Sequence, residues 1–442
     1  MGELSDKNKK KKYLIISSVI NIGILFIYKY FDFFNESLSY TLDNFGISYS
    51  LSSLNLLLPV GISFYTFQAL GYTIDVYQGV KKPEKHFGIY ALYVSFFPQL
   101  VAGPIERSTS LIPQFFNEYK FEYNRITSGL RLILLGFFKK VVVADKLAIV
   151  VNHIYQTPQN YEGVPLIIAT LFFSFQIYCD FSGYTDIARG SARVLGFDLV
   201  LNFKQPYFSK SIAEFWRRWH MSLSTWFRDY LYIPLGGNQV NEFRLYINLF
   251  IIFFLCGLWH GANWTFLFWG VLHACYMIIA IRAKSLNLKL SRALILDKVP
   301  FSKIILLLRR NLLINNVFCM VITFALVNLG WIFFRAENLN DAFYITSHLH
   351  CGLGFFISNV MDLSYIRSTL GQLGVIKSDF LMMLFLIACI IAIDIYKEFF
   401  ENKFRFSEQP TWVRWVLYYS IVSVVLFYGS FNSTQGFIYF QF

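Results

Sequence analysis

The sequence predicts an all-α integral membrane protein, and its composition and its long apolar runs support this. Hydrophobic residues make up 56% of the 442 residues and charged residues only 15%, with a mean hydropathy of +0.47. Soluble proteins usually contain about 25% charged residues. Apolar runs recur at residues 13–28, 54–74, 87–102, 164–178, 245–258, 264–281, 317–334, 380–395 and 412–428. Some are shorter than a straight span requires, so we expect about nine to eleven membrane helices, including tilted or broken ones.

The chain has a net charge of +12, and the positions of its basic residues indicate how it is oriented in the membrane. Lys7 and residues 9–12 precede the first apolar run, and further basic residues lie in other segments between runs. Basic residues beside spans mark cytoplasmic loops. We therefore expect residues 1–12 to form a basic cytoplasmic N-terminus, and we expect no nucleic-acid partner because the basic residues are dispersed and no recognition fold is visible.

Residues 13–442 are expected to form a single transmembrane domain, because no linker, low-complexity tract or fixed-period repeat divides them. The first apolar run is longer than a signal peptide and lacks an A-x-A site, so it is expected to be a retained anchor. Pro59, Gly61 and the 98–104 segment predict kinks or helix ends. The mixed stretch at residues 337–378 predicts short surface helices.

The segment FWRRWHMSLSTWFRDY, residues 215–230, concentrates charge within this apolar chain. On a helical wheel Trp219, Leu223, Trp226 and Tyr230 share one face, and polar residues cover the others. A charged group at the bilayer centre costs about 2.5–3.5 kcal/mol, so the predicted helix should lie at an interface or line a wet cavity within the protein. The simpler alternative is an interfacial helix whose arginines contact membrane lipid headgroups.

A second unusual segment, LCGLWHGANWTFLFWG at residues 255–270, places His260 within an apolar region. Gly257 and Gly261 permit close approach by another helix or a ligand. Ionisable residues inside membranes are functional candidates, and histidine exchanges a proton near neutral pH. Asn263 is predicted to share the face of His260 and to orient a carbonyl or the imidazole. The alternative is a structural histidine bonded to a neighbouring carbonyl.

Motifs for several other chemistries are absent from the sequence, including GxSxG, the P-loop, HExxH and the dinucleotide fingerprint. The six cysteines show neither CxxC pairs nor zinc spacing and read as small buried hydrophobes. His220 and His260, each preceded by tryptophan, lack further clustered ligands, so no metal site is expected. The two histidines therefore indicate proton handling.

Several segments of the chain together resemble a known family. They are YCDFSGYTDIARGSARVLGFDLVLNFKQPY (178–207), EFWRRWHMSLSTWFRDYLYIPLGGN (214–238), GLWHGANWTFLFWG (257–270), GFIYFQF (436–442) and LVAGPIERSTSLIPQF (100–115). They resemble the membrane-bound O-acyltransferase (MBOAT) family, and within it the bacterial branch of alginate and peptidoglycan O-acetylation proteins. The resemblance spans nearly the whole chain.

The resemblance implies a fold and an activity. The fold is a ring of transmembrane helices, with short re-entrant or interfacial helices, around a thinned centre with a funnel on each face. The implied enzyme is an O-acetyltransferase of the bacterial inner membrane that moves an acetyl group from a cytoplasmic donor to an extracytoplasmic polysaccharide, such as alginate, cellulose or peptidoglycan. Acetyl-CoA is the expected donor, with no bound cofactor. A separate extracytoplasmic acetyltransferase partner is expected to finish the transfer.

The resemblance also assigns the candidate residues. The family's WHG histidine corresponds to His260 and its RRWH histidine to His220. Acyl transfer to a hydroxyl needs a base, and we assign that role to His260. The supporting or oxyanion candidates are Asn263, Trp259 and His220. The donor-binding or funnel-lining candidates are Arg217, Arg218, Arg228, Asp229 and Asp180, with Asp180 expected to pair with an arginine of the 215–230 segment.

Two alternatives remain open at this stage. The D-alanyl transfer protein of teichoic-acid modification shares the RRWHMSLS and WHG segments and takes its acyl group from a carrier protein, whereas YLYIPLGGN and FIYFQF favour the acetylation branch. A non-enzymatic transporter or scaffold would predict charges spread over several spans or an inverted repeat. Here the charges concentrate around one predicted helix, which favours the enzyme.

Overall fold

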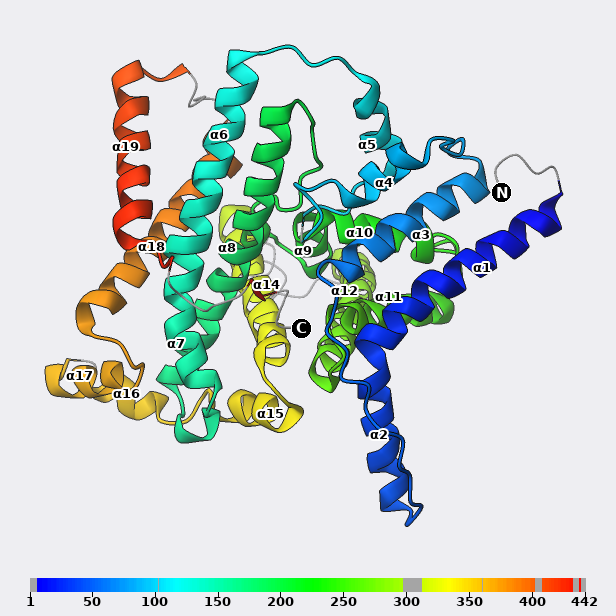
Figure 1. Ribbon diagram of the computed structural model, residues 1–442. Helices are drawn as coiled ribbons and strands as arrows, with labels where there is room; N and C mark the ends of the chain where they lie inside the picture. Colours follow the sequence, from blue (N-terminus) through cyan, green and yellow to red (C-terminus); the bar gives the residue numbers. More distant parts are fainter. Residues whose placement is uncertain are drawn as a thin grey trace.

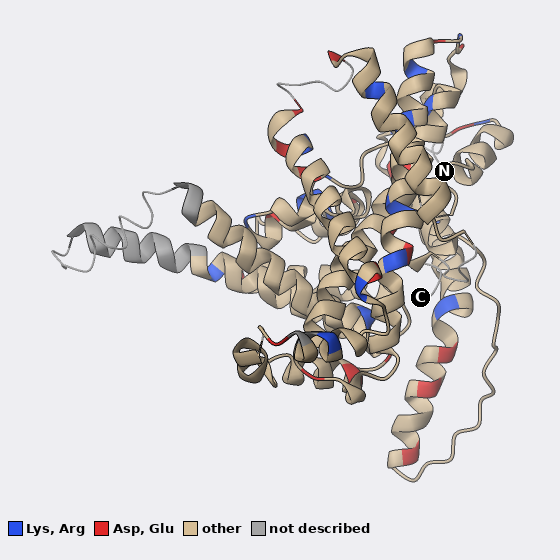
Figure 2. Cartoon of the chain, turned by 90° about the vertical axis from the view of Figure 1, so that its left-hand side faces the viewer, with Lys and Arg blue, Asp and Glu red and all other residues tan. Residues whose placement is uncertain are grey.

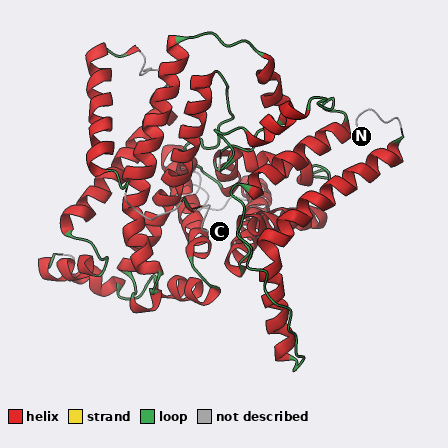
Figure 3. Ribbon diagram, viewed as in Figure 1, coloured by secondary structure: helices red, strands yellow, loops and turns green. Residues whose placement is uncertain are grey.

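A computed structural model describes residues 6–101, 103–296, 312–359, 361–401, 408–431 and 437–438. Every regular element within these residues is a helix, which confirms the all-α prediction (Figure 3). Residues 1–5 of the predicted basic N-terminus lie outside this described part. So does the terminal 436–442 segment, apart from Phe437 and Ile438.

Seven helical stretches of the described chain are long and apolar enough to cross a membrane: Lys7–Asn44, Val164–Leu195, Glu242–His260, Trp264–Ala283, Asn315–Arg335, Lys377–Phe400 and Thr411–Tyr428. The estimate of nine to eleven included apolar runs that form shorter elements. The 54–74 run becomes helical only at α3 (Ile62–Gln78), after Gly61 adopts a left-handed φ of 78°. The 87–102 run forms the nine-residue α4 (Phe87–Ser95), and this helix ends before Pro98.

The N-terminal part of the chain is one long helical arm at the edge of the molecule (Figure 1). It comprises α1 (Lys7–Leu25), a π-helical stretch η1 (Phe26–Tyr30) and α2 (Phe31–Asn44). The lysines at positions 7 and 9–12 lie in the first turns of α1, and the Asp6 side chain caps the helix by accepting the Asn8 N–H. α1 packs beside α3, while α2 projects away with acidic residues along its length (Figure 2).

The central helix is α8 (Val164–Leu195), because 72% of its apolar window is buried. It packs against a continuous helical run made of α6 (Tyr123–Phe137), π-helical η3 (Phe138–Ala144) and α7 (Asp145–Tyr155). Glycines permit this contact: a Cβ atom on Gly136 would lie 2.6 Å from the carbonyl oxygen of Gly183. Small residues at such crossings let membrane helices approach closely.

Beside this core, α11 (Glu242–His260) and α12 (Trp264–Leu296) form a tight helical hairpin, and α14 (Leu312–Arg335) packs against α12. A Cβ atom on Gly257 would lie 2.3 Å from the carbonyl oxygen of Phe266. This confirms the prediction that Gly257 allows another helix to approach.

The remaining elements are shorter or more peripheral. They are α5 (Ser108–Leu111), η2 (Ile112–Phe116), η4 (Pro158–Asn160), η5 (Pro206–Phe208), α9 (Ile212–Arg218), α10 (Met221–Phe227), η6 (Arg228–Tyr232), α15 (Leu339–His348), α16 (Leu353–Asn359), α17 (Leu363–Gly371), α18 (Lys377–Ile395), η7 (Tyr396–Phe400) and α19 (Thr411–Tyr428). The short helices α15, α16 and α17 confirm the prediction for residues 337–378. α19 lies at the outer edge of the bundle (Figure 1).

Candidate active site

The charged segment at residues 215–230 is not one helix, so the single helical wheel predicted from the sequence is wrong. α9 ends at Arg218 and α10 begins at Met221, with a break at Trp219 and His220. His220 has φ of 42° and ψ of 55°, the left-handed conformation. Such a conformation in a residue other than glycine costs about 1–3 kcal/mol and persists only where the surroundings impose it.

Asn202 holds the break at His220 in place. Its backbone carbonyl accepts the Met221 N–H at 3.0 Å, and its side-chain Oδ1 accepts the Ser222 N–H at 3.1 Å. The Ser222 hydroxyl in turn accepts the Ile105 N–H at 3.0 Å. Two N–H groups at the start of α10 thus have partners outside the helix. Asn202 is fully buried and was missed by the sequence analysis, since nothing in the LNFKQPY run marks it.

The His220 side chain is enclosed by aromatic rings and is fully buried. Its ring centroid lies 4.7 Å from that of Phe181 on α8 and 5.8 Å from that of Trp259 on α11. Phe64 on α3 stacks on it at 6.5 Å. Three helices far apart in the sequence therefore contribute the walls around this imidazole.

His260 is the last residue of α11, and it too lies among aromatic rings. Its ring centroid is 5.0 Å from that of Trp259, 5.1 Å from that of Trp269 and 5.1 Å from that of Phe334. The backbone then turns into an extended conformation at Gly261, which has φ of −164°. The carbonyl groups at this helix end receive hydrogen bonds from the N-terminal arm: Lys29 Nζ lies 2.8 Å from the Trp259 oxygen and 3.0 Å from the His260 oxygen.

The fold brings together the two Trp–His pairs that the sequence analysis singled out. The indole of Trp259 contacts both imidazoles, at 5.8 Å from His220 and 5.0 Å from His260 between ring centroids. Trp259 itself is buried and donates its indole N–H to the Ser63 carbonyl at 3.4 Å. The two imidazoles thus lie buried against one indole, among mainly aromatic rings.

Asn263 lies just beyond this site and is engaged by the chain. Its Nδ2 donates to the Glu337 carbonyl at 2.9 Å, and its Oδ1 accepts the Thr265 N–H at 3.0 Å at the start of α12. The latter contact is that of a helix N-cap. An orienting or oxyanion role for Asn263 stays a prediction.

The structure separates the charged residues of the 215–230 segment into two groups. Arg218 forms a bidentate pair with Glu398 of η7, at 2.8 and 3.0 Å, and a further ion pair with Glu214 at 2.8 Å. Arg228 pairs with Asp229 at 2.7 Å, and Asp229 also accepts Arg107 at 2.9 Å.

Arg217 and Arg228 both present exposed side chains, unlike the half-buried Arg218. The first two are therefore the arginines of this segment that the rest of the chain leaves uncovered. Because the carboxylates of Glu214 and Glu398 occupy its guanidinium, Arg218 acts as a brace between α9 and η7.

Asp180 belongs to a buried ionic network between α8 and η3. It pairs with Lys140 and accepts the Ile438 N–H at 2.8 Å, so the expectation that it pairs with an arginine of the 215–230 segment is wrong. The neighbouring Lys139 pairs with Asp186 at 2.7 Å. Opposite charges that face each other inside a helical bundle avoid the cost of facing lipid. Neither lysine was among the predicted site residues, although two adjacent lysines within an apolar segment are a usable signal in the sequence.

A buried carboxyl group, Glu106, lies in the loop that supports the His220 break. Its side chain accepts the Val200 N–H, and it adjoins Ile105, whose N–H bonds to Ser222. Burial raises the pKa of Glu106 from 4.5 to about 7. This carboxyl group therefore changes its charge near neutral pH while it holds two loops together.

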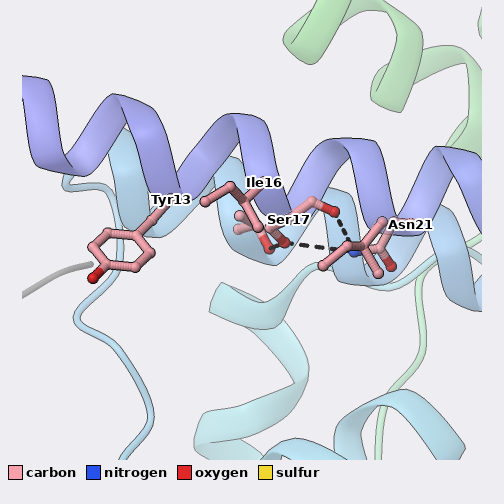
Figure 4. A pocket seen from close by; sticks show the side chains of 6 residues that line it. Tyr13, Ile16, Ser17 and Asn21 are labelled. Atoms are coloured by element: carbon pink, nitrogen blue, oxygen red, sulfur yellow. Dashed lines mark hydrogen bonds between the residues drawn. The ribbon is translucent and has the colours of Figure 1, made fainter.

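Two cavities lie along the N-terminal arm. One, of about 320 Å³, borders the His260 turn and is lined by Tyr28, Lys29, Leu58, Gly261, Ala262, Asn263 and Phe266. The other, of about 390 Å³, lies between α1 and α3, where Asn21 bonds to Ser17 (Figure 4). Only the first adjoins a candidate catalytic residue. In the described part of the chain, no group of three or more histidine, cysteine, aspartate or glutamate side chains is arranged to hold a metal ion.

The comparisons with known proteins agree with this architecture. Residues 86–286 match the model of the membrane-bound O-acyltransferase family. The chain is 38% identical over 375 residues to a Pseudomonas aeruginosa protein named "Probable alginate O-acetylase AlgI", covering 85% of this chain and 66% of that protein. It is 32% identical to the peptidoglycan O-acetyltransferase of Helicobacter pylori, covering 98% of this chain and 83% of that protein.

A more distant relative is the teichoic acid D-alanyltransferase of Streptococcus thermophilus, 29% identical over 246 residues, with 51% of this chain and 57% of that protein covered. The chain spans between 59% and 66% of the length of four of the alginate O-acetylases that it matches. The matched family model and the nearly full-length match to the Helicobacter protein confirm the resemblance seen in the sequence. This chain belongs to the membrane-bound O-acyltransferase family.

Proposed function

We propose that this protein is a membrane O-acetyltransferase that moves an acetyl group from a cytoplasmic donor across the membrane for O-acetylation of an extracytoplasmic polysaccharide. The observation that carries the proposal is the convergence of His220 and His260 on the Trp259 indole within an aromatic site. The names of its relatives, which include alginate and peptidoglycan O-acetylating proteins, support acetyl transfer to a polysaccharide.

The chemistry of the proposed reaction matches the site. His260 takes the proton of the acceptor hydroxyl as its oxygen attacks the carbonyl carbon of an acetyl thioester. The C–O bond forms, the C–S bond breaks, and the imidazolium returns the proton to the departing thiolate. A positioned general base contributes about 10²- to 10⁴-fold to such a reaction. Exclusion of water by the aromatic walls limits hydrolysis of the thioester.

Acetyl-CoA is the proposed donor, reaching the site from the cytoplasm. Arg217 and Arg228 are the exposed basic residues of the 215–230 segment, and guanidinium groups bind phosphates by charge-assisted hydrogen bonds. Arg218, occupied by two carboxylates, would instead hold the wall of the funnel.

The proposed location is a bacterial inner membrane, with the N-terminus in the cytoplasm. The lysines in the first turns of α1 and the acidic residues on α2 support this orientation under the positive-inside rule. The acceptor polysaccharide, and an extracytoplasmic acetyltransferase partner that completes the transfer, would then meet the protein at the opposite face.

The test is a donor and acceptor panel with the purified protein in lipid nanodiscs. Acetyl-CoA should release free CoA thiol in the presence of polysaccharide acceptors, either with the partner protein or alone, and mass spectrometry should find acetyl esters on the acceptor. Nanodiscs without the protein are the control. Release that needs a D-alanyl carrier protein instead would favour the function of the teichoic acid relatives. Absence of transfer from every donor would contradict enzymatic function and favour a scaffold.

A further inference from the structure

The first membrane-crossing stretch of the chain supplies a lysine to the His260 turn. Lys29, in η1, donates to the carbonyl oxygens of Trp259 and His260 at 2.8 and 3.0 Å and to the hydroxyl of Ser63 at 3.4 Å. Lys29 and His260 are 231 residues apart in the sequence. The sequence alone indicates only a membrane anchor in this region.

The next residue adds a further donor to the same helix end. The Tyr30 hydroxyl donates to the Leu258 carbonyl at 3.0 Å, so three consecutive carbonyls at the end of α11 have partners from η1. The last carbonyls of any helix lack partners within that helix. Without water they need another donor, and a cation at this end also interacts favourably with the helix dipole.

The hydrogen bonds of Lys29 favour a supporting role over direct binding of a substrate. An ammonium group has three N–H donors, and the three acceptors on the chain match them. Lys29 therefore acts through the backbone of the turn. The cavity of about 320 Å³ that Lys29 lines with Gly261 and Asn263 lies against the same turn, so movement of the backbone there would shift His260 relative to anything in the cavity.

We propose that Lys29 is a positioning residue for His260, with Tyr30 as a second support. The inference rests on the proposed acetyltransferase function, in which His260 is the base. It makes the N-terminal arm part of the catalytic framework. Loss of the ammonium group would let the last turn of α11 loosen, and the imidazole would then leave its reactive position.

The kinetic test compares full-length variants in nanodiscs with acetyl-CoA. Lys29→Met should lower kcat about 10- to 100-fold and leave KM for acetyl-CoA unchanged, because misplacement by about 1 Å has effects of this size. Lys29→Arg, which keeps a cation and several donors, should restore most of the loss. The control is Lys12→Met, which removes an exposed lysine from the same arm. A wild-type kcat in Lys29→Met, or a loss that appears only in KM, would overturn the inference.

A second measurement is independent of the activity. Hydrogen–deuterium exchange in the peptide covering residues 255–264 should be faster in Lys29→Met than in wild type, and near wild type in Lys29→Arg. Unchanged exchange in Lys29→Met would overturn the inference, whether or not the wild-type protein is active. An inactive wild type would count against the proposed function alone. If Lys29→Met does not fold, Tyr30→Phe serves instead: it removes one donor and should raise exchange in the same peptide. Unchanged exchange in that variant would also overturn the inference.

Discussion

The two Trp–His turns of this protein share a dipeptide but are built in different ways. His220 lies in a break between two short helices, in a left-handed conformation that Asn202 holds through the backbone that follows. His260 lies at the end of a long helix, whose carbonyls are bound by Lys29 of the N-terminal arm. A shared dipeptide therefore does not define a shared backbone structure.

Access also differs between the two turns. A cavity of about 320 Å³ is lined by residues that follow His260, including Gly261 and Asn263. His220 instead has Phe181, Phe64 and Trp259 around its ring. The cavity thus borders the backbone that follows His260, whose own imidazole lies among Trp259, Trp269 and Phe334. His260 stays the proposed base and His220 its proposed support.

The largest expected effect is the loss of the base. His260→Ala should lower kcat for acetyl transfer by about 10²- to 10⁴-fold, because no positioned group then takes the hydroxyl proton. The measurement is CoA release under saturating acetyl-CoA, with protein amounts matched. His153→Ala, which removes an exposed histidine on α7, is the control. A His260→Ala variant with wild-type kcat would refute the assignment of the base.

A smaller effect is expected for His220, and it would sharpen the contrast between the turns. Asparagine tolerates left-handed backbone, so His220→Asn keeps the break while removing the ring from between Phe181 and Trp259. We expect kcat to fall about tenfold, less than for His260→Ala, together with a lower melting temperature because the smaller side chain fills the space less well. A loss in His220→Asn equal to that in His260→Ala would show that both imidazoles handle the proton.

The sequence predicted the membrane class and the helical composition, because hydropathy is a local signal. It also singled out the two histidines that the fold brings to Trp259, although their catalytic roles stay predictions. It did not predict the break at His220. Residues 215–230 have helical periodicity, and the break depends on hydrogen bonds to Asn202, which the chain reaches only by folding. Lys29 was missed for the same reason: its two backbone acceptors, the carbonyls of Trp259 and His260, lie more than 200 residues away.

The support at Asn202 gives the next prediction. Asn202→Ala would leave the buried Ser222 N–H without its acceptor, and an unsatisfied buried donor costs about 1–3 kcal/mol of stability. The melting temperature should fall, and kcat should fall severalfold as the His220 turn loosens. Asn202→Asp, which retains an oxygen acceptor, should keep more of the activity than Asn202→Ala. Equal activity in Asn202→Ala and wild type would show that the His220 turn does not contribute to catalysis.

The smallest effect is expected at Glu106. This residue lies next to Ile105 in a second loop that supports the His220 turn. Its pKa is raised by burial from 4.5 to about 7, so between these values the folded protein holds a proton that the unfolded chain releases. This contribution to stability is complete below pH 4.5, is lost as the pH rises towards 7, and changes little above it. Glu106→Gln cannot ionise and should escape this loss.

The melting temperature of Glu106→Gln relative to wild type should therefore increase by a few degrees from pH 5 to pH 8 and then level off. Exposed Glu118→Gln is the control and should show no such trend. A constant difference across this range would mean that the Glu106 carboxyl group does not change its protonation on unfolding there. Because Glu106 contacts the loop at Val200 and adjoins Ile105, the same variant should leave the turn that carries His260 unaffected in hydrogen–deuterium exchange. The two Trp–His turns would then prove to have independent supports.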